Sequence, residues 1–292
     1  MLFKNSDEAK SFAVVATSRR QSYEEATQSI QYFQENLERA KGEGKEIWEK
    51  HIQELETWLA SDEYKKGDYP QGIDELMLEL VEWRASIFSL QKTETKKSPF
   101  TENVFFQQWL IGGVYATYSL LGKLTGNDPR EKSLRNLWWK VYKHIARDGA
   151  CKTPELKRIQ EKLEKATGQF TDSRSKGILF RNTVIAHNQK SIVLDWNEID
   201  DDIRVLIRIW SLIVSWSSFG IISPFRKGEK AFSGLEYFFD QQELTQLYKN
   251  RQEYIDKCIG WARTYLHDDK FDPGGYFMAK ISLSTNIAFS TN

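Results

Sequence analysis

The amino-acid sequence predicts an all-α protein, a helical bundle with additional N-terminal helical hairpins. Apolar residues recur at three- and four-residue steps through most of the chain, which is the spacing of one helix face. No stretch alternates apolar and polar residues with the two-residue period of a strand, and no repeat of fixed length is present. With 40% hydrophobic residues, 13% aromatic residues and only 6 Pro, the composition excludes disordered and collagen-like classes.

Residues 1–97 form the first predicted region, a series of amphipathic helices. Gly42-Glu43-Gly44 marks a turn between two of them, and the Gly- and Pro-containing stretch 67–72 precedes a third. The apolar faces of these helices carry Ile30, Phe33, Leu37, Ile52, Leu55, Leu76, Leu80 and Ile87. We expect these helices to pair as hairpins.

Residues 98–225 form the second predicted region, the bundle itself. A strongly apolar helix begins after Asn103, and another carries apolar residues at helical spacing from Leu134 to Ile145. A short helix begins at Pro154, because the missing N–H of proline is harmless in the first turn of a helix.

Two further helices complete the bundle region. One spans Asp172 to about His187. The other follows Asp195, an acidic N-cap with Glu198 three residues later, and runs to about Gly220.

Residues 226–292 form the third predicted region, a helix from about Gln241 to Leu266 and an irregular tail without a predicted partner. The most apolar stretch of the chain, 203–222, contains two arginines, which suits a buried bundle helix better than a membrane span. The first residues lack the apolar run of a signal peptide, and the two cysteines form no CxxC spacing. We therefore expect a cytoplasmic protein that does not enter a membrane.

The charge is balanced over the whole chain, with 41 basic and 41 acidic residues, but it is uneven along it. Residues 21–80 contain 15 acidic and 6 basic residues, a difference of −9, whereas residues 130–165 contain 11 basic and 5 acidic residues, a difference of +6. The basic stretch can attract a polyanion such as RNA. The predicted RNA-binding residues within it are Arg135, Lys140, Lys143 and Arg147.

Common catalytic signatures are missing from the sequence. It has no phosphate-binding loop, dinucleotide-binding GxGxxG, GxSxG or HExxH motif. Asp200, Asp201 and Asp202 can bind a divalent ion, but acidic residues in a first helical turn are explained as well by the helix dipole. We predict neither a metal nor a cofactor.

The segment from Phe180 to His187 is unusual because it places polar groups in an apolar helix. Apolar side chains surround nearly the whole circumference, so we expect the helix to be largely buried, yet it carries Arg181, Asn182 and His187. A buried guanidinium is costly without a partner, so the three polar groups indicate either an internal network or a functional cleft.

The pattern of Arg181, Asn182, four apolar or small residues and His187 resembles the R-x(4–6)-H signature of HEPN-domain proteins. The order of segments 118–124, 133–134 and 179–187 is similar to that of the AbiU2-like branch. The resemblance covers about residues 99–224. Gln189 stands where the adenylylated form of the motif has Tyr, so that form is not supported.

The resemblance implies a dimeric helical bundle that cleaves RNA without a metal, in a toxin–antitoxin, abortive-infection or antiviral defence system. The expected partners are RNA, a second copy of the chain, and an antitoxin or other defence-system protein. In such an enzyme His187 serves as the acid or base, Arg181 stabilises the charge on phosphorus and Asn182 holds the phosphate or the imidazole.

A structural interpretation of the same residues stays open at this point. Arg181 can pair with an interior carboxylate such as Asp195 or Asp200, and His187 can cap a helix C-terminus. The chain would then be a non-catalytic helical binding or scaffold protein. The tryptophans likewise suit core packing better than base stacking.

Overall fold

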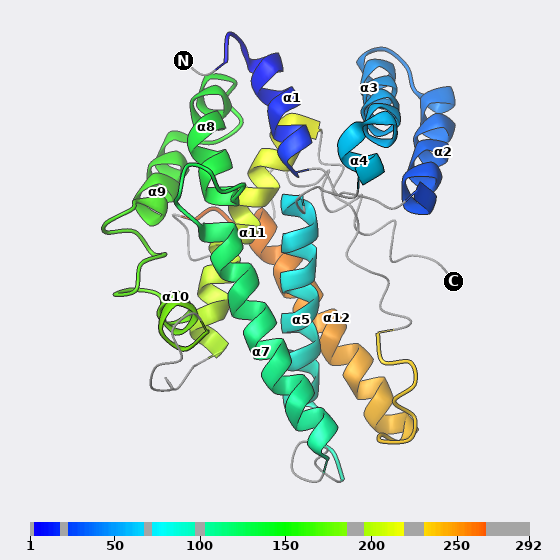
Figure 1. Cartoon of the computed structure of the whole chain (residues 1–292), viewed down its shortest axis with the longest axis vertical. Coiled ribbons are helices and arrows are strands. Elements are labelled where there is room, and N and C mark those ends of the chain that lie inside the picture. Colours follow the sequence, from blue (N-terminus) through cyan, green and yellow to red (C-terminus); the bar gives the residue numbers. More distant parts are fainter. Residues whose placement is uncertain are drawn as a thin grey trace. The chain divides into compact units, whose positions relative to one another are not determined.

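The computed structural model in Figure 1 describes residues 3–17, 23–66, 72–96, 103–185, 196–218 and 231–266. These residues form eleven α-helices and one π-helical turn, with no strand among them. The prediction of an all-α protein is confirmed. The C-terminal tail lies outside the described residues, as do His267 and the predicted end of the 203–222 stretch.

The chain divides into two compact units, residues 18–75 and residues 1–17 with 76–292. The smaller unit contains α2 (Tyr23–Arg39), α3 (Glu43–Ala60) and α4 (Asp62–Lys66). The larger unit contains α1 (Ser6–Thr17), most of α5 (Ile73–Lys92), α7 (Val104–Thr125), α8 (Leu134–Arg147), α9 (Thr153–Leu163), α10 (Lys176–Phe180), the π-helical turn η1 (Arg181–Ile185), α11 (Trp196–Ser218) and α12 (Gln241–Arg263). The predicted boundaries at 97 and 225 do not separate compact units.

In the smaller unit, α2 and α3 pack against one another as the predicted hairpin. Gly42 has a φ of 59° immediately before α3, a left-handed conformation that glycine adopts without strain. The rings of Phe33, Trp48 and His51 lie together between the helices. Burial, with a smaller contribution from Lys50, lowers the pKa of His51 to about 4.

In the larger unit, α11 is the central helix. It packs against α1, α8, α10 and α12, and nearly all of its described side chains are buried. The interpretation of the 203–222 stretch as a buried bundle helix is therefore confirmed for its described part, residues 203–218. Within the described part of the chain, no helix is both long enough and apolar enough to cross a bilayer.

The helix starts follow from local capping chemistry. The side chain of Asn103 accepts a hydrogen bond from Phe105 N at the start of α7. Pro154 occupies the first turn of α9, as predicted. Asp240 and Glu243 form a reciprocal capping box at the start of α12.

A buried ion pair explains why α5 belongs with the bundle. Arg84 on α5 donates two hydrogen bonds to Asp200 on α11, at 2.9 and 3.1 Å. The hydroxyl of Tyr254 on α12 donates to the same carboxylate at 2.8 Å. Because an isolated buried charge is costly, these three helices form one interdependent core.

Candidate functional site

The segment that carries Arg181 is not one continuous helix. α10 ends at Phe180, and the chain continues as the π-helical turn η1. Ser175 caps α10 by accepting a hydrogen bond from Ile178 N, and residues 164–175 form the loop that precedes it. Residues 186–195, with His187 and Asp195, lie outside the described residues. Single π turns within helices occur often at functional sites.

Burial differs between the two parts of this segment. In α10, Gly177, Ile178 and Phe180 are buried. A Cβ at position 177 would lie 2.8 Å from Leu121 Cδ2, so glycine allows α10 to lie directly on α7. In η1 no residue is buried, and Arg181 is exposed. The prediction of a largely buried helix is therefore right for α10 and wrong for the turn.

Arg181 and Asn182 are joined in a short chain of hydrogen bonds. Arg181 Nη1 donates to Asn182 Oδ1 at 2.8 Å, and Asn182 Nδ2 donates to Asp172 Oδ1 at 2.7 Å. On the other side, the guanidinium lies close to α7, because a Cβ at Gly122 would be 2.9 Å from Arg181 Nε. The guanidinium is thus held in place by a neutral amide and a backbone contact.

Of the two carboxylates that the structural interpretation offered to Arg181, Asp200 is bound instead by Arg84 and Tyr254, and Asp195 lies outside the described residues. Among the described residues, no carboxylate lies within ion-pair distance of Arg181. Arg208 and Arg251, in contrast, are paired with Glu155 and Glu82.

Arg135 is a structural residue, and its predicted role in RNA binding is wrong. It is 2% exposed, and its guanidinium donates to the carbonyl of Leu163 at 3.0 and 2.6 Å and to that of Thr125 at 3.3 Å. Burial lowers the pKa of this guanidinium. Arg135 therefore ties the ends of α7 and α9 to α8.

The other three predicted RNA-binding residues are exposed on α8. Two of them reach α1: Arg147 donates to Ser6 Oγ at 2.6 Å, and the ammonium of Lys140 lies 5.3 Å from the centre of the Phe12 ring. Lys143 lies 6.0 Å from the ring centre of Tyr142 on its own helix. Arg147 and Lys140 thus contact α1 while staying exposed, and the role of all three residues in RNA binding stays a prediction.

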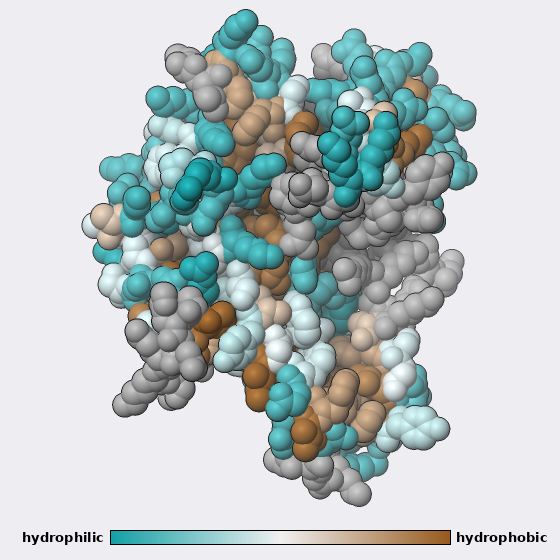
Figure 2. Space-filling view, in the orientation of Figure 1, coloured by the Kyte–Doolittle hydropathy of each residue, from teal (hydrophilic) through white to brown (hydrophobic). Residues whose placement is uncertain are grey.

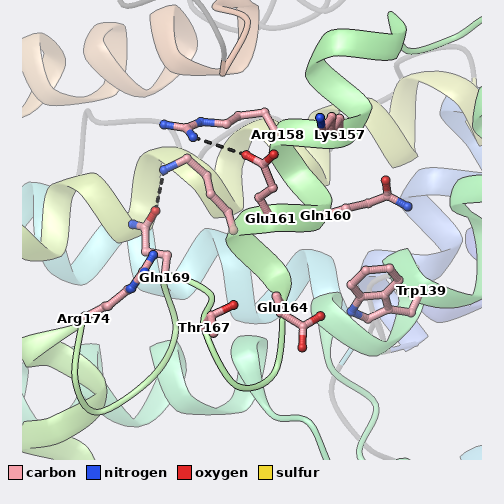
Figure 3. Close-up of a pocket in the computed structure, with 10 residues that line it drawn as sticks. Trp139, Lys157, Arg158, Gln160, Glu161, Glu164, Thr167, Gln169 and Arg174 are labelled. Atoms are coloured by element: carbon pink, nitrogen blue, oxygen red, sulfur yellow. Dashed lines mark hydrogen bonds and ion pairs between the residues drawn. The ribbon is translucent and has the colours of Figure 1, made fainter.

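A groove that was not among the predicted sites lies along the outer face of α9 (Figure 3). We call it the α9 groove. The groove consists of two neighbouring pockets, of about 880 Å³ and about 630 Å³. Trp139 and residues of the 164–174 loop also line the first pocket. The residues that line both pockets are Arg158, Lys162, Gln169 and Arg174. The second pocket extends to Asp172, the partner of Asn182.

Hydrogen bonds connect the α9 groove to the start of α10. Lys162 Nζ donates to Gln169 Oε1 at 2.7 Å, and Gln169 Nε2 donates to Asp202 Oδ1 at 2.7 Å. Ser175, the cap of α10, donates to the other oxygen of Asp202. Burial raises the pKa of Asp202 to about 6, and the hydrogen bonds from Ser175 and Gln169 oppose the rise.

The remaining candidate groups have structural surroundings. His144 is buried beside Phe3, and both cysteines are buried free thiols. Among the described residues, no group of three or more His, Cys, Asp or Glu side chains is placed to hold a metal ion. Of the tryptophan pair, Trp138 is fully buried, whereas Trp139 is 36% exposed in the α9 groove.

Comparison with known proteins identifies no relative: no protein-family model, curated protein or solved structure matches the chain.

Proposed function

We propose that this protein is a metal-independent endoribonuclease of the HEPN type that acts in a toxin–antitoxin, abortive-infection or antiviral defence system. The observation that carries the proposal is the state of Arg181. Its guanidinium is exposed on a π-helical turn and bonded to the neutral amide of Asn182, so its charge is available to an anion. His187 follows six residues later in the sequence.

RNA contains its own nucleophile, and the reaction needs only proton transfer and charge stabilisation. The 2′-hydroxyl attacks the adjacent phosphorus, the bond to the 5′-oxygen breaks, and a 2′,3′-cyclic phosphate and a 5′-hydroxyl result. His187 moves a proton to or from these oxygens, since imidazole titrates near neutral pH. Arg181 stabilises the negative charge that develops on the phosphoryl oxygens.

Asn182 is a positioning residue in this scheme. It accepts from Arg181 and donates to Asp172, so it fixes the guanidinium without neutralising it. A carboxylate in the same place would form an ion pair with Arg181 and compete with phosphate. The Asn182 amide therefore suits an anion-binding arginine better than a structural one.

We also propose that the enzyme is a homodimer formed through α7. From Val104 to Gly122 this helix has no charged residue, and its outward side chains include Val104, Phe105, Ile111 and Tyr115, all exposed. Figure 2 shows apolar residues at the surface along the course that α7 follows in Figure 1. A second copy of this uncharged face is its natural complement, and Gly122 beside Arg181 brings the site to its edge.

Cleavage of a fluorescent single-stranded RNA by purified protein in EDTA tests the nuclease proposal. We expect Arg181→Ala and His187→Ala each to slow cleavage by about 100-fold or more, because removing one charge-stabilising donor costs about that much. The matched control is Arg130→Ala, an exposed arginine that pairs with Asp128 in a loop. Products of the wild type should carry 2′,3′-cyclic phosphates.

Unchanged cleavage in the two variants, with all variants folded by circular dichroism, would exclude this site. A wild type that cleaves no RNA would favour the non-catalytic scaffold protein.

Sedimentation tests the dimer: the Ile111→Glu variant should be a monomer, whereas the wild type should be a dimer. A wild type that sediments as a monomer, or an Ile111→Glu variant that stays a dimer, would show that the proposed interface is wrong.

A further inference from the structure

We propose that the α9 groove binds the single-stranded RNA that leads to the cleaved bond, with Trp139 stacked on a base and the cations of α9 on the phosphates. This inference deepens the proposed function and rests on it for the position of the cleaved bond. It assigns a binding role to residues of α9 and the 164–174 loop, none of which belongs to the R-x(4–6)-H pattern.

Trp139 has the properties of a stacking platform. Its neighbour Trp138 is fully buried in the core, whereas Trp139 keeps 36% of its surface exposed and lines the pocket. Tyr142 contacts it edge-on at 5.4 Å between ring centres, which fixes the plane of the indole. Figure 3 shows Trp139 on the other side of the pocket from Gln169 and Arg174. A base stacks on such a ring whatever its sequence.

Cationic side chains crowd the rest of the pocket. Lys157, Arg158, Lys162 and Arg174 line it, against two carboxylates. One of these carboxylates, Glu161, is bonded to Arg158 at 3.4 Å. Burial lowers the pKa of Lys162, and the nearby charges of Arg158 and Arg204 lower it further. A bound phosphate would relieve this repulsion, since it supplies the counter-charge.

The groove also leads toward Arg181. The two pockets share four residues, and the second reaches Asp172, which holds Asn182 and through it Arg181. Asp172, Glu198, Asp201 and Asp202 line the second pocket beside its cations, so we place the phosphates on the cations that both pockets share, Arg158, Lys162 and Arg174. From these residues the strand continues toward Asp172 and the Arg181 turn. An acidic peptide would neutralise the cations but has no base to stack on the exposed indole of Trp139. The presence of the indole beside the cations therefore favours RNA.

Fluorescence anisotropy with a labelled 12-nucleotide single-stranded RNA tests the inference, with 2′-O-methyl groups to prevent cleavage. We expect Trp139→Ala to weaken binding by about 5- to 100-fold and Trp139→Phe to restore most of it. Lys162→Gln should weaken binding and reduce the salt dependence by about 0.7 in the log–log slope for one lost phosphate contact. The matched controls are Tyr237→Ala, a 97% exposed ring, and the exposed Lys65→Gln on α4.

Competitors identify the ligand class. Single-stranded DNA of the same sequence should compete, because stacking and phosphate contacts do not read the 2′-hydroxyl, whereas duplex RNA should compete poorly. Stronger competition by duplex RNA or by polyglutamate would overturn the inference. So would wild-type binding by folded Trp139→Ala and Lys162→Gln.

The two proposals fail separately. If cleavage depends on Arg181 and His187 while Trp139→Ala and Lys162→Gln bind and cleave as the wild type does, the groove proposal alone is wrong. If the groove variants lose RNA binding but the wild type never cleaves RNA, the nuclease proposal alone is wrong. Arg181→Ala should lose cleavage, and its loss of affinity for the 2′-O-methyl RNA should not exceed that of a single phosphate contact.

Discussion

Two arginines of the larger unit show opposite uses of the same side chain. Arg208 lies in the core, 2% exposed, and binds both oxygens of Glu155 at 2.7 and 2.9 Å and the carbonyl of Ala262 at 2.6 Å. Arg181 lies at the surface and binds a neutral amide. Arg208 holds helices together, whereas Arg181 has no carboxylate partner among the described residues, and we propose that its charge serves a ligand. The burial of an arginine and the charge of its hydrogen-bond partner therefore indicate whether it has a structural role better than the residue type does.

The largest expected effect comes from breaking the buried pair. Arg208→Met leaves the fully buried Glu155 without its cation, and we expect it to lower the free energy of unfolding by about 3–5 kcal/mol. Urea denaturation measures this loss. The double variant Arg208→Met with Glu155→Leu should recover most of it, and a double variant as unstable as the single one would contradict the explanation.

Two buried carboxylates differ in the same way. Asp202 accepts hydrogen bonds from the neutral side chains of Gln169 and Ser175, whereas Glu155 is paired with Arg208. Its pKa is raised to about 6 by burial, so the folded protein binds the proton more tightly than the unfolded chain does. The ionisation of Asp202 therefore lowers the free energy of unfolding as the pH rises from about 4 through 6. Relative to the wild type, Asp202→Asn should gain about 3 kcal/mol between pH 4 and pH 8.

Thermal or urea unfolding at several pH values checks this gain. The comparison of the two proteins cancels the titration of all other carboxylates. A difference that is constant with pH would show that Asp202 titrates normally.

A substitution at Gly122 tests whether cleavage depends on the position of the Arg181 guanidinium. In Gly122→Ala the new Cβ would lie 2.9 Å from Arg181 Nε, so the guanidinium must shift. We expect cleavage to fall by about tenfold, whereas stability should hold or rise by up to about 1 kcal/mol from the better helix propensity of alanine. The control is Gly44→Ala in α3, where the new Cβ meets its nearest atom at 3.9 Å. Equal cleavage by both variants would remove the argument for a fixed guanidinium.

The smallest expected effect is that of Arg181→Ala on stability. An exposed arginine with one amide partner contributes little to folding, so the free energy of unfolding should change by less than about 0.5 kcal/mol. Urea denaturation beside Arg208→Met makes the contrast direct. A loss of 2 kcal/mol or more would place Arg181 with the structural arginines.

Much of the fold follows from local sequence signals. Asn103, Pro154 and Asp240 mark helix starts by chemistry that acts within a few residues. The break at Phe180 has no such signal, because it accompanies the contacts of α10 and Arg181 with α7. The pairing of Arg84 with Asp200 spans 116 residues along the chain, so no local pattern predicts it.

The candidate site was predicted in part. Arg181 and Asn182 are hydrogen-bonded neighbours, and His187 stays a prediction. Arg135 was misassigned, because a basic stretch does not reveal which cation points inward. The α9 groove had one signal in the sequence, the indole of Trp139 beside a region rich in Lys and Arg, but only the folded loop brings Arg174 and Gln169 to it.

The convergence of Arg84, Asp200 and Tyr254 limits how the protein can be trimmed. A recombinant fragment cut at 98 and 225 would lose the first and last of these partners and carry Asp200 as an uncompensated anion. The smallest stable fragment should therefore retain α5 and α12, whereas residues 18–72 are the segment to replace with a short linker.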